Sequence, residues 1–175
     1  MNWLSTICFI FFSLTAVAQN DTTYNGLLNS TKEINITDSI SINKNQWLAL
    51  RLDTNLVKKW FRQILPSTPN NRLKNRAYYL AGKITSNPIF NILVVLEEKR
   101  QTDSTNSRIV YLFTTKKDGT YISSLETIVI GNRKKSIFST ASWLYWDNRI
   151  VQDYKITLNQ KIYADLRKYK LNKTG

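Results

Sequence analysis

Carboxylates and hydroxyls are the main groups in this chain that could perform chemistry. The sequence contains no His, and its single Cys is Cys8. A Ser-His-Asp triad, an imidazole base and a Cys/His zinc site are therefore excluded. A metal would have to be held by oxygen ligands alone, which favours calcium or magnesium. We predict no cofactor and no metal site.

Several carboxylates stand where structural roles are expected. Glu97 and Glu98 are adjacent, so on a strand they point to opposite faces and cannot form a catalytic pair by themselves. Asp53 precedes an amphipathic stretch and is placed to cap a helix. Asp118 and Asp147 stand in turn sequences. A glycosidase needs two carboxylates facing each other across a cleft, and the spacing indicates no such pair.

The remaining acids and hydroxyls give no stronger catalytic signal. Glu126 and Asp153 lie on predicted strands among basic residues, where cross-strand ion pairs are expected. A Ser–Lys dyad is the one nucleophile–base pair that the composition allows. Serine and lysine stand close together in the sequence at Ser136, which follows two lysines in a basic turn. Phosphate-binding glycine motifs are absent. We therefore predict a protein without enzymatic activity, the alternative being a hydrolase with oxygen-only catalytic groups.

An aromatic cluster is the first candidate binding surface. Trp143, Tyr145 and Trp146 precede a turn sequence, with Leu144 among them. On a strand, Trp143 and Tyr145 share one face, while Leu144 and Trp146 share the other. Such aromatics either fill the core of a curled sheet or form a platform on which a sugar or a peptide stacks.

A basic loop is the second candidate. The chain carries a formal charge of +13, spread over short clusters rather than one basic tail. Arg133, Lys134 and Lys135 could bind an anion, or could form a solvated hairpin loop. A solvated basic surface is favoured over nucleic-acid binding. Anionic polysaccharide of an envelope remains a possible partner.

The N-terminal residues 1–18 predict a secretory signal peptide. An apolar run leads to Ala16 and Ala18, the small residues that a signal peptidase reads, with Gln19 as the new N-terminus. The rival interpretation is a membrane anchor, but the run is shorter than the roughly 20 apolar residues that span a bilayer. We therefore expect a periplasmic or secreted protein without a membrane span after cleavage.

Beyond the signal, the pattern predicts a lead-in, one helix and a long sheet. Residues 19–32 are polar and are expected to be a flexible lead-in. Residues 33–37 and 39–42 alternate apolar with polar, as short strands do. An amphipathic helix should begin after Asp53 and end at Pro66.

From residue 77 onward the periodicity is two. Turn sequences at 117–120, 147–148 and 159–160 join the strands, and joints this short require antiparallel neighbours. The fold class is therefore α+β, with one amphipathic helix packed on a long antiparallel β-meander, either flat or curled, in a single domain over 33–175. The predicted strands are 77–84, 90–98, 108–115, 120–130, 137–146, 149–158 and 161–171.

The segments 78–84, 91–96 and 111–125 also carry a family resemblance. Their sequences, YYLAGKI, NILVVL and YLFTTKKDGTYISSL, are hairpin-forming. From about residue 53 to the end, the chain resembles a group of small uncharacterised exported proteins of Bacteroidetes with a helix followed by a β-meander. The resemblance implies a β-rich exported domain and implies no activity.

Together these features predict an exported, non-enzymatic binding or assembly protein of a bacterial envelope. A cationic binder of polysaccharide or nucleic acid is the third interpretation, beside the hydrolase. A free sheet edge or an exposed aromatic face would favour partner binding by strand addition. Carboxylates converging in a pocket would favour the hydrolase.

Overall fold

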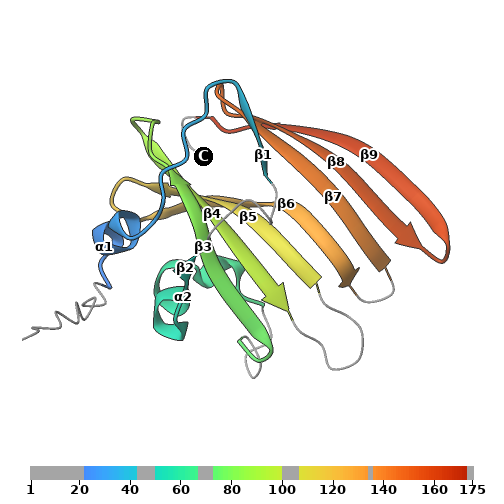
Figure 1. Cartoon of the computed structure of the whole chain (residues 1–175), viewed down its shortest axis with the longest axis horizontal. Coiled ribbons are helices and arrows are strands. Elements are labelled where there is room, and N and C mark those ends of the chain that lie inside the picture. Colours follow the sequence, from blue (N-terminus) through green and yellow to red (C-terminus); the bar gives the residue numbers. More distant parts are fainter. Residues whose placement is uncertain (1–21, 43–49, 67–72, 100–106, 134–135, 173–175) are drawn as a thin grey trace, which may run out of the picture.

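The computed structural model describes residues 22–42, 50–66, 73–99, 107–133 and 136–172, which form an antiparallel sheet with short helices on one side (Figure 1). Strands account for 61% and helices for 12% of the structure, and the sheet is open. The predicted cleavage residues Ala16, Ala18 and Gln19 lie outside the described residues, as do Lys134 and Lys135. None of the helices in the described part of the chain is long and apolar enough to cross a membrane.

The described residues form nine strands, of which eight follow one another across the sheet in the order β2 to β9, while β1 pairs with β7 off this path. Every pairing between these strands is antiparallel in the described residues, as the short joints predict, and Glu33 forms an isolated parallel bridge with Lys83. The strands are β1 (Ser39–Ile42), β2 (Leu50–Arg51), β3 (Arg76–Ile84), β4 (Phe90–Lys99), β5 (Ser107–Lys116), β6 (Tyr121–Arg133), β7 (Ser136–Tyr145), β8 (Arg149–Leu158) and β9 (Lys161–Lys170).

The predicted turns carry the backbone conformations that such hairpins need. Gly119, Asn148, Asn159 and Gln160 all have positive φ, at 92°, 64°, 48° and 64°. Two consecutive residues with positive φ, as at 159–160, make a type I′ turn, whose twist matches that of the flanking strands. The boundaries of β3 to β9 therefore fall within three residues of those predicted from the sequence.

The helices differ from the prediction of one long element. Asp53 caps α2 (Thr54–Trp60) as expected, since its Oδ1 accepts hydrogen bonds from the N–H groups of Asn55 and Leu56 at 2.7 and 2.9 Å. The α-helix nevertheless ends before Pro66, at Phe61, whose φ of −121° is not helical. Phe61 is fully buried against Phe113, and a single 3₁₀ turn, η2 (Arg62–Ile64), follows. The α-helix thus ends where Phe61 adopts a non-helical conformation that buries its ring.

Part of the expected flexible lead-in, 19–32, is instead helical. Residues Tyr24–Asn29 form α1, with the Thr23 side chain capping its first turn. Tyr24 and Leu27 are buried, and the Tyr24 ring packs against Trp60 with centroids 5.4 Å apart. Burial of these two apolar side chains anchors a segment that composition alone marks as polar.

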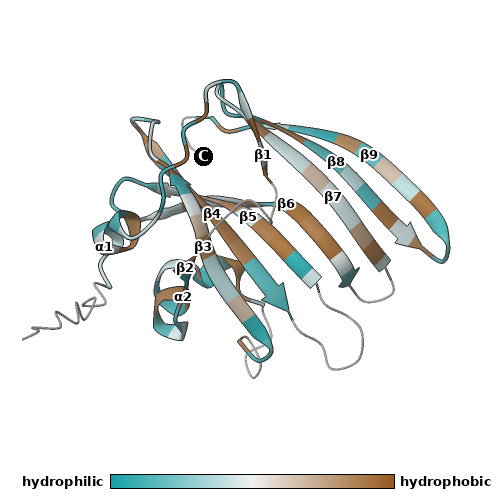
Figure 2. Ribbon diagram, in the orientation of Figure 1, coloured by the Kyte–Doolittle hydropathy of each residue, from teal (hydrophilic) through white to brown (hydrophobic). Residues whose placement is uncertain are grey.

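Two hydrophobic cores lie on opposite faces of the central strands β3 to β5. The first, here called the helix core, is covered by α1, α2 and η2 and contains Phe61, Leu93 and Phe113. The second core contains Ile42, Val94 and Leu144, contributed by β1, β4 and β7. Figure 2 shows the resulting concentration of hydrophobic residues on β4 and β5. The sheet thus bends far enough for β1, β7 and β8 to cover the face that the helices leave free.

The bend occurs at a seam between β6 and β7. The two strands share four paired positions in the described residues, and the C-terminal half of β7 pairs with β1 instead. Beyond these four positions, three buried side chains bond to the backbone of β6 in place of backbone hydrogen bonds between the two strands. Thr140 bonds to the backbone of Val129, Ser142 to the carbonyl of Thr127, and Gln152 Nε2 to that carbonyl at 2.9 Å and to the carbonyl of residue 126 at 2.8 Å.

Candidate functional site

The structure divides the predicted aromatic cluster between two environments. Leu144 is fully buried in the second core, whereas Trp143 and Tyr145 are half-buried on the opposite face of β7. Trp146 follows the strand and keeps 66% of its surface exposed. The Arg149 guanidinium lies 5.0 Å from the centre of the Tyr145 ring. One aromatic ring therefore stands free, and the cluster does not form a continuous aromatic platform.

The predicted anion loop is described only in part. The backbone of Arg133 belongs to the end of β6, where it pairs with Ser136 on β7. The preceding Gly131 has a φ of 102° and pairs with Phe138. The strands therefore reach further toward the turn than predicted, and the loop is shorter.

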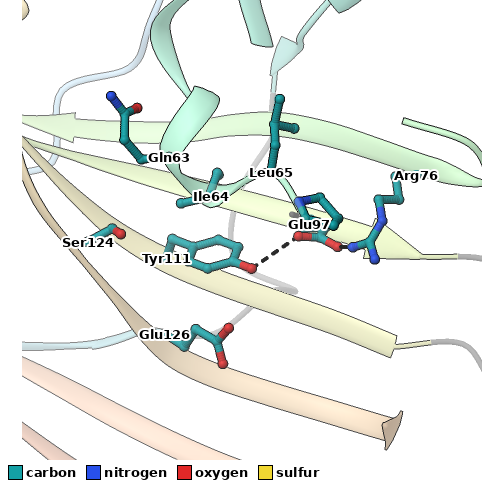
Figure 3. Close-up of a pocket in the computed structure, with 9 residues that line it drawn as sticks. Gln63, Ile64, Leu65, Arg76, Glu97, Tyr111, Ser124 and Glu126 are labelled. Atoms are coloured by element: carbon teal, nitrogen blue, oxygen red, sulfur yellow. Dashed lines mark hydrogen bonds and ion pairs between the residues drawn. The ribbon is translucent and has the colours of Figure 1, made fainter. Parts of the chain in front are cut away.

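A polar pocket of about 390 Å³ lies between η2 and the sheet (Figure 3). Neighbouring strands supply its floor, and the segment around η2 supplies its rim. The lining residues are Gln63, Ile64, Leu65, Pro66, Arg76, Glu97, Tyr111, Ser124 and Glu126. Two carboxylates that are far apart in the sequence thus line one cavity.

Glu97 is the most buried charged group of this pocket, with 1% of its surface exposed. The Arg76 guanidinium forms an ion pair with it, and the hydroxyl of Tyr111 donates a hydrogen bond to its Oε2 over 3.1 Å. A buried carboxylate keeps its charge when a cation and a hydroxyl donor compensate for lost hydration. Glu98 points the other way, as predicted, and pairs with Arg108 at 2.9 Å.

Tyr78 lies beside this ion pair, opposite Glu97 on the neighbouring strand. Its ring is 2% exposed, and its hydroxyl has no hydrogen-bond partner among the described residues. Burial raises the pKa of Tyr78 to about 12, partly offset by the charge of Arg76. The phenol is therefore neutral and is not a base at ordinary pH.

The acids outside the pocket have structural partners. Asp118 accepts a hydrogen bond from the N–H of Thr120, and Asp147 pairs with Arg149 across its turn at 2.6 Å. Asp153 pairs with Lys155 two residues along the same strand at 2.8 Å, rather than across strands as predicted. No cluster of three metal-ligating side chains occurs within the described ranges.

The outer end of the sheet presents a different kind of site. β9 is the last strand, and nothing in the described part of the chain pairs with its outer edge. Both of its faces are largely exposed, including Ile162 at 73%, Tyr163 at 55% and Leu166 at 60%. Figure 1 shows β8 and β9 extending beyond the helix-covered part of the sheet. Unpaired backbone groups beside exposed apolar side chains are typical of a site for strand addition.

The hairpin fixes which backbone groups of β9 point outward. Leu158 and Lys161 flank the two-residue turn and form the pair that closes it. A type I′ hairpin closes on a pair that exchanges both backbone bonds, and such pairs alternate along antiparallel strands. The residues whose N–H and C=O groups face away from β8 are therefore Ile162, Ala164, Leu166, Lys168 and Lys170.

Sequence reasoning missed both the pocket and the free edge as sites. The pocket depends on the register of strands that bring Glu97 and Glu126 to one cavity, which no local pattern shows. The edge had a signal that could have found it. The predicted strand 161–171 alternates exposed apolar residues with charged ones, and in the observed strand order β9 has β8 as its one neighbour in the described residues.

Compared with models of protein families, with curated proteins and with solved structures, the chain matches none.

Proposed function

We propose that this is a non-enzymatic binding or assembly protein that engages a partner by strand addition at the outer edge of β9. The single observation that carries the proposal is the ten-residue edge strand with five outward-facing residues. Exposed sheet edges are usually protected by charged side chains, above all Lys, or by Pro, a bulge or a covering segment. Of these devices β9 has three lysines, Lys161, Lys168 and Lys170. β9 contains no Pro and pairs with β8 without a register shift.

Apolar side chains next to the edge support the same function. Ile137 on β7 is 54% exposed, and Ile162 and Leu166 on β9 are exposed further still. Lys155 on β8 and Lys168 on β9 lie on the same face of the sheet. Apolar surface with a polar rim is the usual composition of a docking surface.

We place this activity outside the cytoplasm, in the periplasm or beyond, because residues 1–18 have the pattern of a signal peptide. The partner would then be another envelope protein. The chain's formal charge of +13 would also attract anionic polysaccharide there.

The test blocks the edge without disturbing the hairpin. The N–H of Ala164 points away from β8, so Ala164→Pro removes only an outward donor, which edge strands tolerate. Ala164→Val is the matched control, because it keeps the donor and favours strand conformation. A photo-reactive amino acid at Leu166 in both variants, expressed in the cells that naturally make the protein, reports contacts at the edge.

We expect the valine variant to form a cross-linked adduct and the proline variant to lose most of it. Circular dichroism should show the same sheet content in both. If the two variants cross-link equally, or if neither does, binding at the β9 edge is refuted.

A hydrolase is the second candidate, favoured by Glu97 and Glu126 lining the same pocket. In a glycosidase one carboxyl group of such a pair acts as the acid and the other as the base or nucleophile. Glu126→Gln should then abolish hydrolysis of a panel of aryl glycosides, whereas Ser124→Ala on the same strand should retain it. A wild-type protein that hydrolyses no member of the panel contradicts this candidate.

A further inference from the structure

We propose that the partner at β9 is a second copy of this chain, paired antiparallel through β9 and centred on Leu166. This inference rests on the proposed function and adds which strand of the partner pairs with β9 and in which register. The resulting dimer would have two-fold symmetry and one continuous sheet running through both copies.

Backbone geometry limits the possible registers. In an antiparallel pair, a residue that exchanges backbone bonds must face another that does the same. The outward-facing residues of β9 are the even-numbered ones from Ile162 to Lys170. Even-numbered residues must therefore face even-numbered residues, so the symmetry axis passes through a residue and not between two.

Charge and the number of paired residues then select among the remaining registers. An axis at Tyr163 sets Asp165 opposite Lys161, but it pairs only residues 162 and 164 of the outward-facing set. An axis at Asp165 places two carboxylates against each other, and an axis at Arg167 places two guanidinium groups together. An axis at Ala164 sets Arg167 opposite Lys161. The axes at residues 164, 165 and 167 each oppose like charges across the strands, which destabilises a sheet.

An axis at Leu166 instead opposes unlike charges. Asp165 of each copy then faces Arg167 of the other copy, and the symmetry produces this pair twice. Within one chain the same two side chains already lie on one face, with Arg167 Nε 3.0 Å from Asp165 Oδ2. Both are partly exposed, and Arg167 is steadied by Tyr154, whose ring centre lies 3.7 Å from the guanidinium carbon.

This register also matches the uncharged side chains and uses the whole edge. Tyr163 faces Tyr169 of the other copy, and the two Leu166 side chains lie next to each other across the axis. Tyr163 and Leu166 are more than half exposed in one chain and would gain apolar contacts. All five outward-facing residues of each copy find a partner: 162 with 170, 164 with 168, and 166 with itself.

The experiment measures self-association by sedimentation velocity of the purified protein and of charge variants. Arg167→Asp and Asp165→Arg each place like charges twice across the axis. We expect each variant alone to associate at least about tenfold more weakly than the wild type. The double variant Asp165→Arg/Arg167→Asp restores opposite charges and should associate as the wild type does.

An equimolar mixture of the two single variants is the decisive sample. Neither variant retains the ion pair within its own chain, yet across the axis each carboxylate meets a guanidinium. We expect the mixture to form a heterodimer with near wild-type affinity, whereas each variant alone stays monomeric at the same concentration. Circular dichroism on each variant confirms that the fold is intact.

Failure of this inference is distinguishable from failure of strand addition itself. A wild-type chain that stays monomeric at about 1 mM, or single variants that associate as tightly as the wild type, overturns the proposed dimer. If the cross-linked adduct at Leu166 then has the mass of this chain plus a different polypeptide, strand addition stands and the second copy is refuted. An adduct of twice the chain mass supports both.

Discussion

At the scale of single residues, buried polar groups determine how this protein responds to its environment. Glu97 is stabilised by Arg76 and Tyr111, while the hydroxyl of Tyr78 is buried beside them without a partner. An unsatisfied buried hydroxyl costs about 1–3 kcal/mol. Tyr78 is therefore a position where the native residue is not the most stable one.

Replacement of Tyr78 by Phe should stabilise the protein, by about 1 kcal/mol at neutral pH, because the buried hydroxyl is removed. The variant should also change the alkaline response. Burial raises the pKa of Tyr78 to about 12 in the folded protein, against 10.0 for the free phenol. Between these values the unfolded chain loses its proton first, so wild-type stability falls as the pH rises, by up to about 3 kcal/mol.

Urea denaturation of both proteins at pH 7, 10 and 12 measures this difference. We expect the stability gap between Tyr78→Phe and the wild type to widen from pH 10 to pH 12. A constant gap over this range would contradict the assigned role of burial.

At the scale of elements, local pattern explains the strands and tertiary contacts explain what the pattern missed. Period-two alternation and positive-φ turn residues predicted β3 to β9, because both signals are local. α2 ended earlier than predicted because Phe61 leaves the helix to reach Phe113, a contact distant in sequence. α1 has only six residues, too few for a periodic signal.

The seam between β6 and β7 was likewise invisible to sequence reasoning. It depends on β1 displacing β6 along half of β7, so that Thr140, Ser142 and Gln152 must replace a backbone ladder. In the sequence these residues are ordinary polar positions on half-buried strands. The pocket likewise depends on the register between strands that are distant in the sequence. In contrast, strand geometry alone predicted that Glu98 points away from Glu97.

Replacement of the seam side chains should therefore lower the free energy of unfolding more than replacement of exposed polar side chains does. Gln152→Leu removes a donor from the partly buried carbonyl of Glu126 and from the buried carbonyl of Thr127, and should lower the unfolding free energy by about 2 kcal/mol. Ser142→Ala should cost about 1 kcal/mol, because Gln152 still bonds to the carbonyl of Thr127. The double variant should exceed the sum, since both donors serve that carbonyl.

Chemical denaturation of the three variants tests the seam. Ser139→Ala is the matched control, since Ser139 lies on the same strand but is exposed, and it should change stability by less than about 0.5 kcal/mol. Strict additivity of Ser142→Ala and Gln152→Leu would contradict a shared acceptor.

At the scale of the whole molecule, burial falls steadily from the centre of the sheet to its outer end. Leu93, Val94 and Val95 on β4 are fully buried, whereas the first six residues of β9 are all exposed. Local opening requires less free energy where fewer apolar contacts are broken. The two ends of one sheet should therefore differ strongly in protection of their backbone amides.

Hydrogen exchange followed by mass spectrometry should reveal this gradient. Amides of β4 should exchange slowly at every protein concentration. The outward amides of Ile162, Ala164 and Leu166 should exchange rapidly in dilute solution and become protected as the concentration rises, because pairing with a second copy would bond them. Equal protection of β9 in dilute and concentrated samples would contradict its role as the associating edge.

The pairing of β1 with β7 also has a consequence for the order of events during synthesis. Ser39 meets Tyr145 in the finished sheet, so the strand that completes the second core is made early and its partner late. Until the ribosome has released β7, β1 lacks its partner strand and the second core lacks Leu144, and contacts this distant form slowly. β1 would thus stay unpaired until residue 145 has been made, and the second core would close later in synthesis than the helix core.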